Sequence, residues 1–226
     1  MPRRLRECDG NIIYHVLNRA VGRGTLFNKK QDYEAFEQVL AETVERSSTR
    51  LLSYAVMPNH WHLLVWPRED GELSEVMRWL SVTHTQRWHA HYHTAGTGPL
   101  YQGRFKSFPV QSDEHFLTVA RYVERNALRA NLVKRAQDWQ WSSLWRRCQR
   151  DKSLTDFLAK WPIATPTDWL RRVNRPLTKG ELEAVRRSVQ RGAPFGGDRW
   201  SARIVRQLGL ESSLRPRGRP RKHDRH

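Results

Sequence analysis

The stretch Met57-Pro58-Asn59-His60-Trp61-His62-Leu63-Leu64-Val65 decides how the rest of the chain is interpreted. Pro and Asn supply turn chemistry, and the bulky apolar residues that follow are typical of a strand. Successive side chains of a strand point to opposite faces. His60 and His62 are therefore expected on one face, and Trp61 is expected on the other as a buried core anchor.

A pair of imidazoles on one strand face is a candidate metal site. Two neutral imidazoles suit a divalent ion, but they leave most coordination positions to carboxylate, amide, water or phosphate oxygens. The alternative is that His60 or His62, or both, are ordinary strand residues.

The composition indicates a basic, polar protein. The 226 residues are 38% hydrophobic, and 40 Lys and Arg against 23 Asp and Glu give a net charge of +17. Such an excess favours a polyanionic partner, chiefly nucleic acid. No apolar run approaches the ~20 residues that cross a bilayer, and no signal peptide follows the basic N-terminus. Cys8 and Cys148 fit free thiols, so we expect a cytoplasmic protein with no membrane partner.

The hydrophobic pattern predicts alternating strands and helices in the first two thirds of the chain. The order is β-α-β-β-α-β-α, and its first six elements match the ferredoxin-like split βαβ arrangement. We expect an α+β fold with an antiparallel sheet, two helices on one face and the last helix on the other. The strands are predicted at 12–17, 50–56, 60–66 and 104–110, and the helices at 30–47, 73–91 and 113–126, of which the last could continue by a further turn.

After residue 150 the chain changes in texture. Prolines separate short helical pieces, and helices with little apolar surface are predicted at 177–191 and 199–208. We therefore divide the chain into a core domain, 1–150, and a basic C-terminal extension, 151–226. Its Arg-Pro-Gly ending is extended and cationic, and could lie in a DNA minor groove; the alternative is a solvated basic tail. The candidate DNA-binding residues there are Arg215, Arg217, Arg219, Arg221 and Lys222.

The predicted helix at 113–126 carries a second pair of chemical residues. Tyr122 and Asn126 are four positions apart and share a helix face. An oriented phenol can act as a covalent nucleophile, and an amide oxygen can complete the shell of a hard metal ion. The alternatives are a packed aromatic at 122 and a helix-end residue at 126.

These two motifs together resemble a known family. His60-Trp61-His62 resembles the HUH motif of single-tyrosine transposases, and Tyr122-Val123-Glu124-Arg125-Asn126-Ala127-Leu128-Arg129-Ala130-Asn131-Leu132-Val133 resembles the tyrosine helix of the IS200-like superfamily. Tyr14-His15-Val16 and the segment 101–107 fit the same family in order and spacing. Within it, the chain is most similar to the REP-associated tyrosine transposases, domesticated bacterial relatives. The resemblance covers about residues 8–147.

The resemblance implies a metal-dependent endonuclease and strand transferase that acts on hairpin-forming single-stranded DNA. Tyr122 would be the nucleophile and would form a 5′-phosphotyrosine link. His60, His62 and Asn126 would be the ligands of Mg²⁺ or Mn²⁺. The resemblance also implies a bacterial, nucleoid-associated protein that is a monomer or a homodimer. Ala127 and Asn131 stand where the family often has Pro and Gly, and neither change touches the chemistry.

Further basic residues and histidines each allow two interpretations of their role. Arg19, and Arg104 with Lys106 on the predicted strand 104–110, are candidates to grip the DNA backbone; the alternative is ordinary surface charge. The histidines of the second helix could form another metal site, but residues two apart diverge on a helix, which favours a solvated or DNA-facing patch. These histidines are His84, His89, His91 and His93.

Two other functions stay open from the sequence. One is a non-catalytic protein that binds DNA hairpins or AT-rich duplex. The other is an RNA hairpin binder, which would prefer ligands that carry a 2′-hydroxyl.

Overall fold

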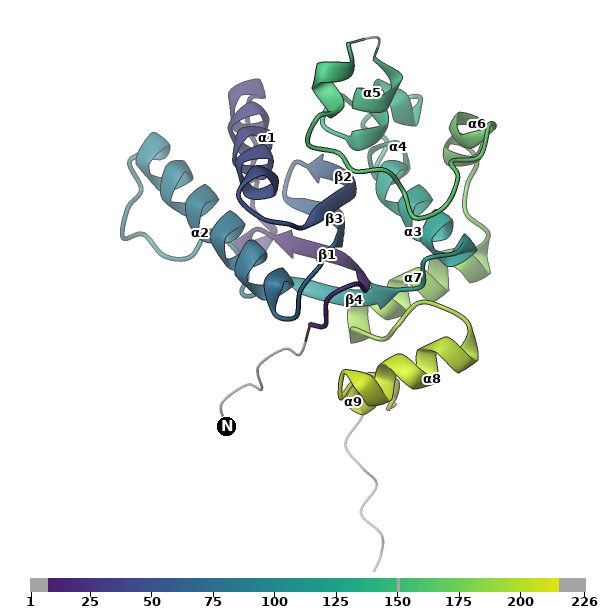
Figure 1. Ribbon diagram of the computed structural model, residues 1–226. Helices are drawn as coiled ribbons and strands as arrows, with labels where there is room; N and C mark the ends of the chain where they lie inside the picture. Colours follow the sequence, from purple (N-terminus) through teal and green to yellow (C-terminus); the bar gives the residue numbers. More distant parts are fainter. Residues whose placement is uncertain (1–7, 150, 216–226) are drawn as a thin grey trace, which may run out of the picture.

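A four-stranded antiparallel sheet forms the centre of the protein. The structure is a computed structural model that describes residues 8–149 and 151–215 (Figure 1). Within that part of the chain the strand order is β2-β3-β1-β4. This is the predicted ferredoxin-like order, and the predicted α+β class is confirmed. The strands are β1 (Ile13–Arg19), β2 (Arg50–Met57), β3 (His60–Trp66) and β4 (Lys106–Val110).

Helices cover both faces of the sheet. α1 and α2 pack against each other on one face, and α3 crosses the other face against β2, β3 and β4 (Figure 1). This is the arrangement expected from the sequence. The helices of the first two thirds are α1 (Lys30–Glu45), α2 (Glu72–Tyr92), α3 (Glu114–Glu124), α4 (Asn126–Arg129) and α5 (Ser143–Cys148).

The alternation of β3 places its side chains as predicted. Trp61 is fully buried in the core beneath α1 and α2, and its indole N–H donates to the Tyr101 hydroxyl at 3.0 Å. Leu64, two residues after His62, belongs to the core beneath α3 instead. Burying a leucine side chain stabilises a fold by about 1.5–3 kcal/mol. The buried apolar residues of β3 therefore hold the face that carries His60 and His62 in place.

The turn between β2 and β3 is fixed by backbone hydrogen bonds from a distant segment. The Pro58 carbonyl accepts from the amides of Leu26 and Phe27, and the Asn59 carbonyl accepts from the amide of Ala20. The carbonyls of a tight turn are otherwise left to water. The start of β3 is therefore held against the segment that follows β1.

Two predicted boundaries differ from the structure in ways that affect the site. β4 begins at Lys106, so the prediction that Arg104 lies on this strand is wrong. Residues 102–104 instead follow an isolated bridge between Ala20 and Tyr101. The helix predicted at 113–126 takes the further turn that the sequence allowed, to Arg129, but it is divided into α3 and α4 at Arg125.

The segment after residue 150 packs onto the same sheet. Val185 of α7 is fully buried beside α3, and Phe195 forms a parallel bridge with Val110 at the end of β4. The helices here are α6 (Trp169–Asn174), α7 (Lys179–Arg191), α8 (Asp198–Gln207) and α9 (Glu211–Leu214).

The apolar residues of this segment are few, as predicted, yet they are used in the core. Ile204 and Val205 of α8 are buried, and α8 contributes to the core cluster beneath α1 and α2. Among the described helices, none is long and apolar enough to span a membrane.

Candidate active site

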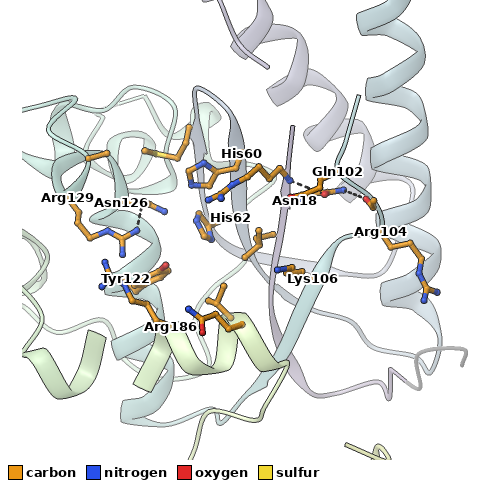
Figure 2. A pocket seen from close by; sticks show the side chains of 17 residues that line it. Asn18, His60, His62, Gln102, Arg104, Lys106, Tyr122, Asn126, Arg129 and Arg186 are labelled. Atoms are coloured by element: carbon orange, nitrogen blue, oxygen red, sulfur yellow. Dashed lines mark hydrogen bonds between the residues drawn. The ribbon is translucent and has the colours of Figure 1, made fainter. Parts of the chain in front are cut away.

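A pocket of about 850 Å³ opens where β1, β3 and the end of α3 meet α7 (Figure 2). The four residues predicted to do chemistry, His60, His62, Tyr122 and Asn126, all line it. Its other lining side chains are Leu17, Asn18, Arg19, Met57, Gln102, Arg104, Lys106, Arg129, Ala130, Arg186, Val189 and Gln190.

Two elements bring the histidines and the tyrosine together. His60 and His62 share the face of β3 that looks toward α3, and their ring centroids are 5.0 Å apart. The Tyr122 ring stands edge-on to the His62 ring, with centroids 5.7 Å apart. Figure 2 shows Tyr122 and Asn126 on the helix that faces the two imidazoles. The spacing of four residues on the helix thus puts a phenol and an amide opposite the two imidazoles.

Both histidines are neutral at physiological pH. Burial lowers the pKa of His60 to about 4, helped by the positive charges of Arg19 and Arg129. Burial also lowers the pKa of His62 well below its usual value, and neighbouring His15 and His60 add to the effect. A metal ligand must offer an unprotonated nitrogen, so this environment keeps the imidazoles in the form that binds metal.

The Nδ1 atom of each histidine is engaged by the protein. His60 Nδ1 donates to the side-chain Oδ1 of Asn59 at 2.6 Å, and an amide oxygen can only accept. The proton of His60 is therefore on Nδ1, and the lone pair is on Nε2. His62 Nδ1 lies 2.8 Å from His15 Nε2. Partners of this kind orient the ring of a metal-binding histidine.

Asn126 offers an oxygen to the same space. Its Oδ1 accepts from Arg129 Nη2 at 2.8 Å, which leaves one of its two lone pairs, and its buried Nδ2 has no hydrogen-bond partner. In the described residues no three His, Cys, Asp or Glu side chains form a group that could hold a metal ion. Two imidazoles and one amide oxygen do fit Mn²⁺ or Mg²⁺ once substrate or water oxygens complete the shell.

The pocket wall is cationic. Arg19, Lys106, Arg129 and Arg186 line it together with Arg104, and no Asp or Glu is among the lining side chains. Figure 2 shows the guanidinium of Arg104 directed away from the histidines. These positive charges attract the phosphate groups of nucleic acid, and no acidic side chain in the pocket wall repels them.

Some predicted residues lie elsewhere. Arg215 is exposed just after α9 and does not line the pocket. The tail residues Arg217, Arg219, Arg221 and Lys222 lie outside the described residues. The prediction of a solvated or DNA-facing patch is wrong for His84, which is buried and lies with its Nδ1 2.7 Å from the Tyr101 hydroxyl.

Four residues of the site were missed in the sequence. His15 and Asn59 hold the two imidazoles, and a signal for His15 existed: it sits mid-strand in β1, which the predicted fold places beside β3. Arg129 lies three residues beyond Asn126 on the same helical face. Arg186 had no such signal, because only the packing of α7 brings it to the pocket.

Comparisons with known proteins bear on the fold and the family of the chain. No curated protein matches the chain. A solved structure of a REP-associated tyrosine transposase bound to a REP hairpin aligns with a TM-score of 0.54 and 17% identity, over 79% of this chain and 99% of that one. This likeness shows the fold. A candidate transposase from Deinococcus radiodurans R1 aligns with a TM-score of 0.38 and 15% identity, over 55% of this chain and 94% of that one.

The family model described as "Transposase IS200 like" matches residues 8–126, which is more than half of the chain and includes His60, His62, Tyr122 and Asn126. The chain belongs to the IS200-like transposase family.

Proposed function

We propose that this protein is a metal-dependent endonuclease and strand transferase that cleaves single-stranded DNA beside a hairpin. The observation that carries the proposal is the edge-on approach of Tyr122 to His62, 5.7 Å between ring centroids, inside a cationic pocket lined by no acidic side chain. A phenol and two neutral imidazoles that line one pocket are parts that phosphoryl transfer to tyrosine requires.

The residues of the pocket divide the work of binding and orientation. His60, His62 and Asn126 would hold Mg²⁺ or Mn²⁺, which when bound polarises the scissile phosphate and neutralises the charge that develops on it. Lys106 and Arg186 would bind neighbouring phosphates of the strand. The reaction would need no nucleotide as an energy source, because the covalent link conserves the phosphodiester energy.

The covalent step exchanges one ester bond for another. The Tyr122 Oη attacks the scissile phosphorus and loses its proton to solvent. The bond from phosphorus to the 3′-oxygen breaks, and that oxygen takes up a proton and leaves as a free 3′-OH. The 5′-phosphate remains on Tyr122, from which a 3′-OH can displace it to rejoin a strand.

We infer that one chain carries a complete site. Tyr122 of α3 and His62 of β3 face each other within a single protomer. The nucleophile therefore acts on DNA held by its own histidines.

The central experiment looks for the covalent intermediate. The protein is incubated with Mn²⁺ and end-labelled single strands that contain a palindrome, and the products are separated under denaturing conditions. We expect a labelled protein–DNA adduct that is lost with Tyr122→Phe, with His60→Ala and with a chelator. The matched control is Tyr92→Phe, which removes a half-buried hydroxyl that donates to Asp32, outside the pocket.

An absence of adduct from the wild-type protein on any palindromic strand, or an undiminished adduct from Tyr122→Phe, contradicts the proposal. Hairpin affinity that survives both His60→Ala and the chelator, with no cleavage, would instead identify a non-catalytic DNA-binding protein. Competition between RNA and DNA hairpins tests the remaining alternative, an RNA hairpin binder, which would prefer the RNA.

Mixing two inactive variants tests the inference about one chain. Tyr122→Phe lacks the nucleophile and His60→Ala lacks a ligand. If the site is complete within one chain, the mixture stays inactive. Recovered adduct in the mixture would show that chains share their residues.

A further inference from the structure

A buried histidine outside the predicted ligand set contacts His62 directly. His15 is fully buried, and its Nε2 lies 2.8 Å from Nδ1 of His62, which is 3% exposed. The contact follows from the register, because Leu17 pairs with His62 and His15 is two residues before Leu17 on the same strand face. The His15 ring stacks on Phe108 at 4.7 Å between centroids, so its position is fixed.

A hydrogen bond between two neutral imidazoles has two forms. In one form His62 Nδ1–H donates to His15 Nε2, and the lone pair of His62 is on Nε2. In the other form His15 Nε2–H donates to His62 Nδ1, and His62 then carries its proton on Nε2. Only the first form leaves His62 a nitrogen with which to bind a metal ion.

The second ligand shows the same arrangement without ambiguity. Asn59 Oδ1 accepts from His60 Nδ1, which directs the lone pair of His60 to Nε2. His15 would accept from Nδ1 of His62 in the same way that Asn59 accepts from Nδ1 of His60. Both imidazoles would then present Nε2 to the pocket.

His15 itself is not placed to be a third ligand. Its other ring nitrogen, Nδ1, is buried and has no hydrogen-bond partner, and His15 is not among the residues that line the pocket. In the form that binds metal, the proton of His15 must sit on this Nδ1, where burial of an unpaired N–H is unfavourable. Metal binding would have to offset that cost.

We propose that His15 is a positioning residue that accepts the Nδ1 proton of His62 and so fixes the tautomer in which His62 can bind the metal ion. The inference rests on the proposed function, since it concerns the metal that the cleavage reaction uses. It adds a residue of β1 to a proposed ligand set that otherwise comes from β3 and α4.

The direct test is the proton position itself. Long-range ¹H–¹⁵N correlation spectra of the histidine side chains distinguish the two neutral tautomers, and no variant is needed. In wild-type protein saturated with Mg²⁺, we expect both His15 and His62 to carry their protons on Nδ1. A His62 proton on Nε2 in that state overturns the proposal.

Metal affinity gives a second readout that is independent of cleavage. Mn²⁺ binding is followed by electron paramagnetic resonance for wild type, His15→Phe and His15→Gln. His15→Phe keeps a ring against Phe108 but has no acceptor, and we expect its affinity for Mn²⁺ to fall about 10–100-fold. His15→Gln keeps an acceptor oxygen and should recover part of the affinity.

The matched control is His84→Phe. His84 is also a buried histidine with a single hydrogen-bonded ring nitrogen, but it lies in the core between α1 and α2 and not at the pocket. Its substitution should leave Mn²⁺ affinity unchanged, and circular dichroism verifies that each variant folds.

The outcomes separate the inference from the proposed function. If wild type binds Mn²⁺ and forms the DNA adduct but folded His15→Phe binds Mn²⁺ equally well, the role of His15 is wrong and the proposed function stands. If wild type neither binds Mn²⁺ nor forms an adduct, the proposed function fails and the inference fails with it.

Discussion

The guanidinium of Arg129 lies 4.5 Å from the centre of the Tyr122 ring and donates from Nη2 to the Oδ1 of Asn126 at 2.8 Å. One side chain thus covers the proposed nucleophile and takes a lone pair of the proposed oxygen ligand. It also places a positive charge where a metal ion and a phosphate would meet.

Arg129→Gln tests the two effects of this charge. We expect tighter Mn²⁺ binding, because a like charge is removed from the metal site, and weaker binding of single-stranded DNA, because a phosphate partner is lost. The slope of log affinity against log salt should fall by about 0.7. Titrations of metal and of a labelled oligonucleotide measure both. The exposed Arg135, paired with Asp138, supplies the control variant Arg135→Gln. Weaker Mn²⁺ binding in Arg129→Gln would show that Arg129 supports the site and does not oppose the cation.

The α7 wall of the pocket predicts a DNA contact made by the C-terminal segment. Arg186→Gln should weaken single-stranded DNA binding roughly tenfold, or about 1.4 kcal/mol, with Mn²⁺ affinity unchanged. The neighbouring Arg187→Gln carries the same charge change on an exposed side chain that does not line the pocket, and should have a smaller effect. Fluorescence anisotropy at several salt concentrations makes the comparison. Equal losses in the two variants would mean that only net charge matters.

The lowered pKa values of the histidines predict that metal binding resists acid. Protons compete with the metal for a histidine only as the pH falls toward the pKa of that histidine in the folded protein, which is about 4 for His60. A histidine with the usual pKa of about 6.5 would lose roughly tenfold in affinity by pH 5.5. We therefore expect Mn²⁺ affinity to change little between pH 7.5 and pH 5.5. A loss approaching 100-fold over this range would contradict the buried, neutral state of both histidines.

A buried carboxylate ties the C-terminal segment to the site helix. Glu124 of α3 accepts from the Trp169 indole at 2.8 Å and from the hydroxyls of Ser143 and Ser53, and burial raises its pKa. Glu124→Ala leaves these buried donors without an acceptor, so we expect a loss of about 2–4 kcal/mol in the free energy of unfolding. Urea denaturation measures it.

The control for that variant is Glu34→Ala, which removes an exposed carboxylate paired with Lys30. Its cost should stay within about 0.5 kcal/mol. A comparable loss in both variants would show that the buried network contributes nothing of its own.

The sequence predicted what local patterns control. The period of two in β3 separated Trp61 from the histidines, and the spacing of four joined Tyr122 to Asn126, because strand and helix geometry alone decide these relations. The sequence did not predict that Arg104 lies outside β4 or that Arg186 lines the pocket. Those positions depend on an isolated bridge at Tyr101 and on the docking of α7, which are contacts between distant segments.

The α7 wall also sets an order in time. Residues from Leu17 to Ala130 line most of the pocket, and Arg186, Val189 and Gln190 complete it. During synthesis these last residues follow roughly 60 positions later, or several seconds at about 5–20 residues per second. A growing chain thus holds its tyrosine and histidines before it holds the wall that grips a strand, and on the proposed function the ability to cut DNA is the last property that the new protein acquires.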